Sequence, residues 1–77
     1  MWRVPSRSSE TTAIRKFGAA VRRERSATGM TQERLADLAN LHLRTVQKIE
    51  AGDINVLITT AQRIQKALGC PWDSLMS

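Results

Sequence analysis

The sequence predicts a compact, all-α domain of five helices, and three observations favour this fold class. Apolar residues recur at spacings of three and four, which is the pattern of one helical face, and they do not alternate for long as a strand would require. Glycine, asparagine and proline stand between these segments, where they end helices or begin them. The chain has 77 residues, 42% of them hydrophobic, which suffices for one small core and one domain.

The first helix follows a polar segment. Residues 1–10 are predicted to form a flexible basic arm, and 11–77 the folded domain. The helix is expected to begin near Glu10 to Thr12 and to end at Gly29, because glycine enters the left-handed region of a C-cap without strain. Its apolar face consists of Ile14, Phe17 and Val21.

The second and third helices are short and are separated by a tight turn. Thr31 is suited to cap the second helix, because its hydroxyl accepts a hydrogen bond from a backbone N–H two or three residues later. Asn40 tolerates the left-handed conformation that such a turn needs. His42 then begins the third helix, and Gly52 ends it.

Two further helices complete the predicted domain. The fourth is expected from about Leu57 to Leu68, with Gly69 as its end. The last is short, from Pro71 to Met76, because proline suits the first turn of a helix.

The charges of the chain are unevenly distributed. Lys and Arg number 12 against 7 Asp and Glu, for a formal net charge of +5, and the whole surplus precedes Met30. A basic small domain suggests a polyanionic partner such as nucleic acid. The alternative is a solvated basic face that only aids solubility.

Composition argues against several other classes of protein. A single cysteine, Cys70, forms no disulfide framework or multi-cysteine zinc site and favours a reducing, intracellular compartment. No apolar run is long enough to cross a membrane, and the N-terminal segment lacks the apolar core of a secretory signal. Cys70 and His42 have no evident acidic partner, and no glycine-rich phosphate loop occurs, so no enzyme, metal site or cofactor is expected.

The segment from Thr31 to Gly52 carries the functional prediction. Two short helices joined by a tight turn leave the outer face of the later helix, about residues 42–50, open to enter the major groove of DNA. That face presents Leu43, Arg44, Thr45, Gln47 and Lys48.

This segment resembles the lambda-repressor and Cro-like helix-turn-helix family, often called XRE. Its Gln-Glu-x-Leu-Ala run begins at Gln32, and its Ile-Glu-x-Gly run ends at Gly52, at the family spacing. The runs Lys-Phe-Gly at 16–18 and Asn-Val at 55–56 are similar to the short controller proteins of restriction–modification systems. The resemblance implies a lambda-repressor-like fold of five helices that binds DNA.

The resemblance also implies roles for individual residues. Gln32 contacts the DNA backbone and buttresses the recognition helix, at a helix N-terminus that favours a phosphate. Arg44 and Lys48 occupy base-reading positions with Leu43, and one arginine–guanine pair contributes about 1–3 kcal/mol of discrimination. The implied DNA-binding set is Thr31, Gln32, His42, Leu43, Arg44, Thr45, Gln47 and Lys48.

Several of these roles have alternatives. Thr45 and Gln47 contact either a phosphate or a base, and His42 either caps its helix or contacts a phosphate. Gln32 is otherwise an ordinary exposed residue of a first helical turn, and the charges of the recognition helix are otherwise a solvated face.

Outside this segment, the resemblance gives one structural pair and one departure. Arg25 and Glu50 match a family ion pair that ties the first helix to the end of the third. The loop after Gly52 reads Asp-Ile-Asn-Val, where the family usually carries Lys or Arg and then Pro to grip a phosphate. Arg3 and Arg7 of the arm either compensate in a minor groove or touch nothing.

The last two helices carry more apolar residues than so small a core can hold, which predicts a dimer surface. The residues concerned are Leu57, Ile58, Trp72 and Met76. The alternative for Trp72 is that it covers the core. Dimers of the family place two recognition helices about 34 Å apart, which matches one helical turn of DNA.

The sequence thus predicts a transcriptional regulator that binds a pseudo-palindromic operator as a homodimer, in the cytoplasm with a bacterial or phage nucleoid. RNA polymerase and a cognate toxin are candidate further partners. The alternative is a protein-interaction module with the same fold, an antitoxin or a coactivator-like domain, which the neutral charge balance after Gly29 favours.

Overall fold

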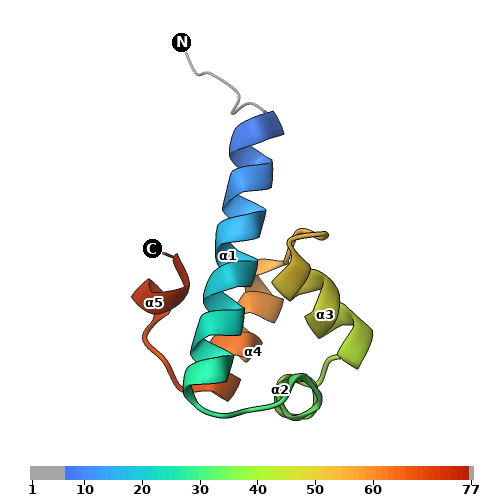
Figure 1. The fold of residues 1–77 in the computed structure, drawn as a ribbon, viewed down its shortest axis with the longest axis vertical. Helices are drawn as coiled ribbons and strands as arrows, with labels where there is room; N and C mark the ends of the chain where they lie inside the picture. The colour runs from blue at the N-terminus through green and yellow to red at the C-terminus, as the bar shows by residue number, and fades with distance from the viewer. Residues whose placement is uncertain (1–6, 77) are drawn as a thin grey trace.

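The computed structural model of the chain describes residues 7–76, with side chains from Glu10 onward. Within this range it is all-helical (Figure 1). The helices are α1 (Arg7–Ala27), α2 (Gln32–Ala39), α3 (Leu43–Ala51), α4 (Ile58–Leu68) and α5 (Trp72–Met76). The all-α prediction of five helices is therefore confirmed for the described residues.

Helix α1 forms the long axis of the molecule, with α3 on one side of it and α5 on the other (Figure 1). It begins at Arg7, before the predicted start near Glu10 to Thr12. No glycine or proline interrupts this stretch, and Glu10 lies in the first turn, where the helix dipole favours a negative charge. The predicted arm of residues 1–10 thus overlaps α1. Its remainder at 1–6, including Arg3, and the side chain of Arg7 lie outside the described residues.

The predicted turn between α2 and α3 is confirmed at its caps. The Thr31 hydroxyl accepts a hydrogen bond from the backbone N–H of Arg34 at 3.0 Å. Asn40 adopts a left-handed conformation with φ of 55°, and its N–H bonds to carbonyls of the preceding turn. His42 is the N-cap residue of α3, which is the helix-capping position predicted for it, although its side chain makes no capping hydrogen bond.

The later helices differ from the prediction by one residue at their starts. Leu57 is the N-cap residue of α4, which begins at Ile58 and ends at the left-handed Gly69. Helix α5 begins at Trp72 rather than Pro71. These shifts leave the predicted inner face of α4 intact, because Ala61, Ile64 and Leu68 are all buried.

The core lies between the helices, and every helix contributes to it. Its largest fully buried side chains are Leu35, Ile49, Ile64, Leu75, Val21 and Val46. Helices α1 and α3 cross closely at Gly18, where an added Cβ would collide with the backbone carbonyl oxygen of Ile49. Glycine at this position therefore sets how close α3 sits to α1.

Candidate nucleic-acid interface

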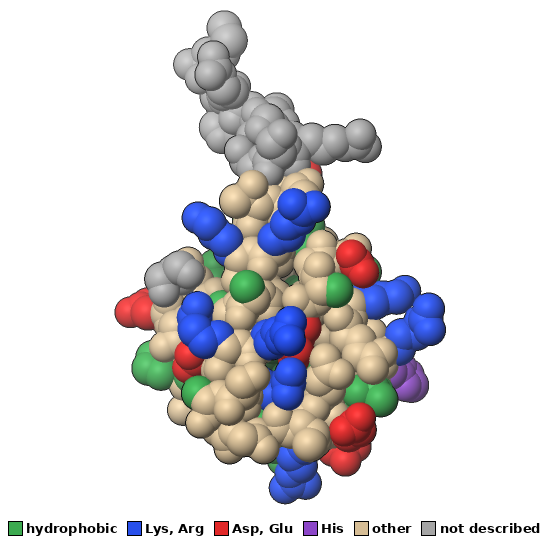
Figure 2. All heavy atoms as spheres, in the orientation of Figure 1, with side chains coloured by type: hydrophobic (Ala, Val, Ile, Leu, Met, Phe, Trp, Pro, Cys, Tyr) green, Lys and Arg blue, Asp and Glu red, His purple; other side chains and the backbone are tan. Residues whose placement is uncertain are grey.

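Helix α3 is held to the core by one face and leaves the other in solvent. Val46 and Ile49 are buried, whereas Arg44, Gln47 and Lys48 are exposed. Of the remaining predicted DNA-binding residues, His42 and Thr31 are exposed and the others are half-buried: Gln32, Leu43 and Thr45. The structure thus brings the predicted set to the N-terminal end of α2 and the outer face of α3. In Figure 2, lysine and arginine side chains lie along α1 and at the outer edge formed by α3.

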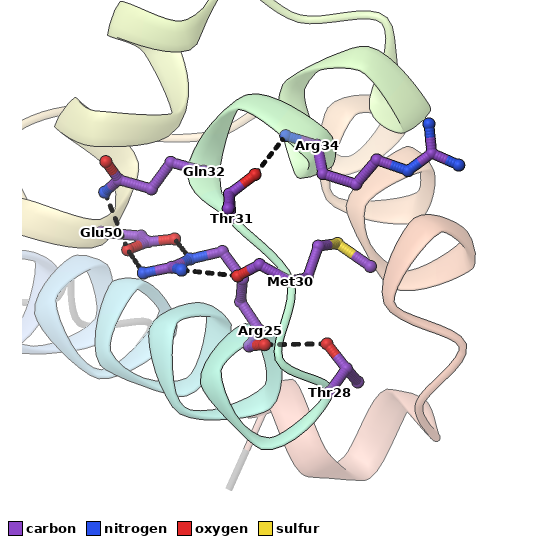
Figure 3. A network of polar contacts seen from close by, with 7 residues as sticks. All are labelled: Arg25, Thr28, Met30, Thr31, Gln32, Arg34 and Glu50. Carbon is purple, nitrogen blue, oxygen red and sulfur yellow. Dashed lines mark hydrogen bonds and ion pairs between the residues drawn. The ribbon is translucent and has the colours of Figure 1, made fainter.

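The predicted ion pair joins α1 to the end of α3. Arg25 Nε donates to Glu50 Oε2 at 2.7 Å, and Arg25 Nη2 donates to Glu50 Oε1 at 3.0 Å (Figure 3). A third bond runs from Arg25 Nη1 to the carbonyl oxygen of Met30 at 2.8 Å. The side chain of Glu50 is only 4% exposed, and the bidentate contact with Arg25 compensates its buried negative charge. The hydrogen bonds to Glu50 raise the pKa of Arg25 above its ordinary value, against a smaller lowering by burial.

Gln32 is tied into the same pair. Its Nε2 donates to Glu50 Oε1 at 3.1 Å, so one carboxylate binds side chains from α1 and α2 (Figure 3). This bond fixes the first residue of α2 against the last turn of α3, which is the buttress that the resemblance implied for Gln32. The two helices of the motif are therefore held at one angle by directed bonds as well as by packing.

A polar hollow of about 400 Å³ opens beside this network. Its lining includes Arg22 of α1 and Gln47 of α3, in addition to Gln32, Arg25 and Glu50. We call these five residues the polar junction. The sequence interpretation assigned no role to Arg22. The signal that could have found it is its spacing of three from Arg25, which places both on one side of α1.

The loop between α3 and α4, where the chain departs from the family pattern, packs partly against the core. Ile54 and Val56 are half-buried and pack against the core. Asn55 Oδ1 accepts a hydrogen bond from the backbone N–H of Val56 at 2.8 Å. Asp53 is exposed, and its backbone N–H bonds to the carbonyl oxygen of Lys48 at 2.9 Å. The loop is thus used for packing and for ending α3.

An apolar groove of about 340 Å³ lies among α1, α4, α5 and the loop before α4. Ile14, Phe17, Ile58, Trp72 and Met76 are among its lining residues. Ile58 and Met76 are 65% and 61% exposed, whereas Trp72 is half-buried and packs against the core. Leu57 is 75% exposed but does not line the groove. The structure therefore groups three of the four predicted dimer residues, and the interpretation of Trp72 as a cover of the core fits its burial.

Other kinds of site find little support among the described residues. No three His, Cys, Asp or Glu side chains gather there as a metal site would need. Within the same range, no helix has the length and apolar character to cross a membrane. Cys70 is buried, and this burial raises the pKa of its thiol.

Comparisons with known proteins identify the family of this fold. The model of the HTH_3 family, described as helix-turn-helix, matches residues 21–75, which run from α1 into α5. The chain belongs to this helix-turn-helix family. The expectation drawn from Gln32 to Gly52 is therefore confirmed.

Similar proteins narrow this family to one group. Control protein C.BamHI of Bacillus amyloliquefaciens is 43% identical over 54 residues, which are 69% of this chain and 67% of that protein. The restriction–modification controller protein C.AhdI of Aeromonas hydrophila is 33% identical with a TM-score of 0.79, covering 83% of this chain and 97% of that one.

A mutant of a second restriction–modification controller protein, C.Esp1396I, gives a similar result. It has a TM-score of 0.76 and 28% identity, and the match covers 82% of this chain and 84% of that one. The helix-turn-helix protein described here is thus a DNA-binding regulator of the controller type and not an enzyme.

Proposed function

We propose that this helix-turn-helix protein binds a pseudo-palindromic operator as a homodimer, with α3 in the major groove of each half-site. The observation that carries the proposal is the hydrogen-bonded junction of Arg25, Glu50 and Gln32, which holds α2 and α3 at a fixed angle. The outer face of α3 beside it is exposed at Arg44 and Lys48. A rigid pair of helices with an exposed polar face is what reading base edges requires.

Within that arrangement, the residues divide into two roles. Arg44 and Lys48 read bases, because a guanidinium or ammonium group donates to the guanine O6 and N7 acceptors, and Leu43 packs on a thymine methyl group. Thr31 and His42 contact the backbone at the ends of their helices. The Thr31 hydroxyl accepts from the Arg34 N–H and retains its own proton for a phosphate oxygen.

The homodimer is proposed from the apolar groove. Two of its lining residues, Ile58 and Met76, are more than half exposed, and Leu57 beside Ile58 is exposed as well. Apolar side chains left in solvent on adjoining helices are typical of a surface that a second copy covers. Two copies related by a twofold axis match a pseudo-palindrome, whose half-sites lie about 34 Å apart.

We infer that the regulated genes belong to a restriction–modification system, because C.AhdI and C.Esp1396I are named restriction–modification controller proteins and C.BamHI is named a control protein. Regulation would occur in the cytoplasm, where the chromosome and RNA polymerase lie. The same names favour this function over that of an antitoxin with a cognate toxin.

The proposed function is tested by selecting DNA from a random duplex library with the full chain. We expect an enriched inverted repeat, and a selected duplex that binds at least about 10³-fold more tightly than a scrambled one at physiological salt. Equal binding of both duplexes, or enrichment without twofold symmetry, would contradict the proposal.

A further inference from the structure

The polar junction offers one positive charge that the fold itself does not use. Arg25 and Glu50 neutralise each other through their bidentate contact. Arg22 lines the same hollow and is exposed, and its side chain makes no hydrogen bond or ion pair with any residue in the described range. The hollow therefore keeps one net positive charge at Arg22.

The rest of the hollow supplies hydrogen-bond donors. Gln47 of α3 lines it with an exposed side-chain amide, and Gln32 lines it from the first turn of α2. Gln32 donates through Nε2 to Glu50, and an amide nitrogen has two protons, so one donor of Gln32 remains. The Gln32 end of α2 is also the positive end of that helix dipole.

The carboxylate at the hollow does not repel an anion as an unpaired one would. Both oxygens of Glu50 are bonded, Oε2 to Arg25 and Oε1 to Arg25 and Gln32. A guanidinium beside two amide donors, with the nearby carboxylate occupied, is chemistry that recognises the oxygens of a phosphate.

We propose that Arg22 and Gln47 add to the backbone contact that the family resemblance implies for Gln32, so that the three side chains bind one phosphate of the operator in each half-site. This inference rests on the proposed function, since the phosphate belongs to the DNA that α3 reads. It assigns Gln47 to positioning on the backbone, whereas Arg44 and Lys48 on the adjoining exposed face read bases. A phosphate bound between α1 and α3 would fix the position of α3 along the major groove of the DNA.

The test compares Arg22→Ala with Arg63→Ala, which removes the same charge from an exposed position of α4 outside the hollow. Affinity for a selected duplex is measured across salt concentrations. For Arg22→Ala, the negative slope of log K (the association constant) against log [salt] is expected to become shallower by about 0.9 per half-site. The ratio of wild-type affinity to Arg22→Ala affinity should therefore decrease about 3.5-fold per half-site between about 50 and 200 mM salt. Arg63→Ala should keep the slope of the wild type, and selection with Arg22→Ala should return the same sequence.

Phosphate ethylation of the selected duplex locates the contact. Ethylation of one phosphate per half-site should weaken binding of the wild type, and ethylation of the same phosphate should have no effect on binding of Arg22→Ala. Arg22→Lys, which keeps the charge without the planar fork, should retain both the interference and the slope while binding more weakly. Unchanged slope and interference in Arg22→Ala, equal losses in Arg63→Ala, or an altered base preference would each overturn the inference.

A separate measurement distinguishes this inference from the proposed function. If the wild type prefers no sequence, the proposed function fails, and the salt slopes on random duplex still report whether Arg22 binds a backbone phosphate.

The side-chain amide signals of Gln32 and Gln47 are also followed by NMR during titration with duplex or inorganic phosphate. Shifts with duplex that are absent in Arg22→Ala support the DNA phosphate. Equal shifts with millimolar inorganic phosphate would assign the site to a small anion and overturn it.

Discussion

The polar junction and the apolar groove both include residues of α1, but they differ in the forces that hold them and in what they leave open. The polar junction joins α1, α2 and α3 by short directed bonds around a Glu50 side chain that is 4% exposed. The apolar groove lies among α1, α4 and α5 and leaves Ile58 and Met76 mostly in solvent. The junction offers hydrogen-bond donors to a polyanion, and the groove offers apolar area to a protein surface.

This difference predicts different responses to mutation. A directed, half-buried network fails when one partner is removed, because the remaining charge is left without compensation. An exposed apolar surface contributes to assembly and little to the fold of one chain, so its loss should leave the helices intact. Substitutions in the polar junction and in the apolar groove should therefore separate folding from assembly.

The largest effect is expected in the polar junction. Arg25→Ala leaves Glu50 buried without its bidentate partner, which costs about 3–5 kcal/mol, a large share of the stability of so small a domain. Urea unfolding followed by circular dichroism measures this loss. Arg23→Ala is the matched control, because Arg23 is 57% accessible and its contacts are an ion pair with Glu24 and a hydrogen bond to the Ser74 carbonyl oxygen. Their loss should cost about 1–2 kcal/mol. Equal losses in the two variants would show that the buried pair does not hold the motif together.

The next effect is expected in the apolar groove. Ile58→Asp places a charge in the proposed dimer surface, which should weaken the dimer by about 3 kcal/mol or more, a factor of at least about a hundred in Kd. Sedimentation equilibrium measures the change, and circular dichroism should show the helices retained. Thr59→Asp adds the same charge one residue later in the first turn of α4, outside the groove lining, and should leave the dimer unchanged. A wild type that is monomeric at all concentrations would refute the assembly.

The smallest effect concerns a buried thiol at the link between α4 and α5. Burial raises the pKa of Cys70, so the native state holds the thiol proton more tightly than the unfolded chain does. The resulting stability is present below the unfolded pKa of about 8.5 and is lost as pH rises above it. The free energy of unfolding of the wild type should thus fall relative to that of Cys70→Ala as the pH rises above about 8.5. If the free energy of unfolding depends on pH in the same way in both proteins, the Cys70 thiol does not contribute to that dependence.

The parts of the fold that depend on short stretches of sequence were the predictable ones. Thr31, Asn40 and Gly52 act within their own turns, so their residue types predict the caps that the structure shows. The start of α1 at Arg7 was missed, because a polar stretch without glycine or proline looks the same in an arm as in a helix.

Features that depend on the crossing of distant helices were harder to predict. The pairing of Arg25 with Glu50 came from a family pattern, since nothing in the spacing of 25 residues identifies it. Arg22 was missed because its neighbours Gln32 and Gln47 approach it only when α1, α2 and α3 pack. The apolar groove likewise forms only when α1 and α5 pack together. Composition alone therefore does not predict that Ile58 lines it and that the adjacent Leu57 does not.

The central claim is that the exposed face of α3 reads sequence through Arg44. The most direct measurement titrates the wild type and Arg44→Ala against the selected duplex and against duplexes substituted at each base pair in turn. We predict that the wild type loses about 1–3 kcal/mol per half-site at one substituted position, and that Arg44→Ala loses discrimination at that position while keeping it elsewhere. A uniform drop in affinity of Arg44→Ala for every duplex, with the pattern of discrimination unchanged, would contradict the claim.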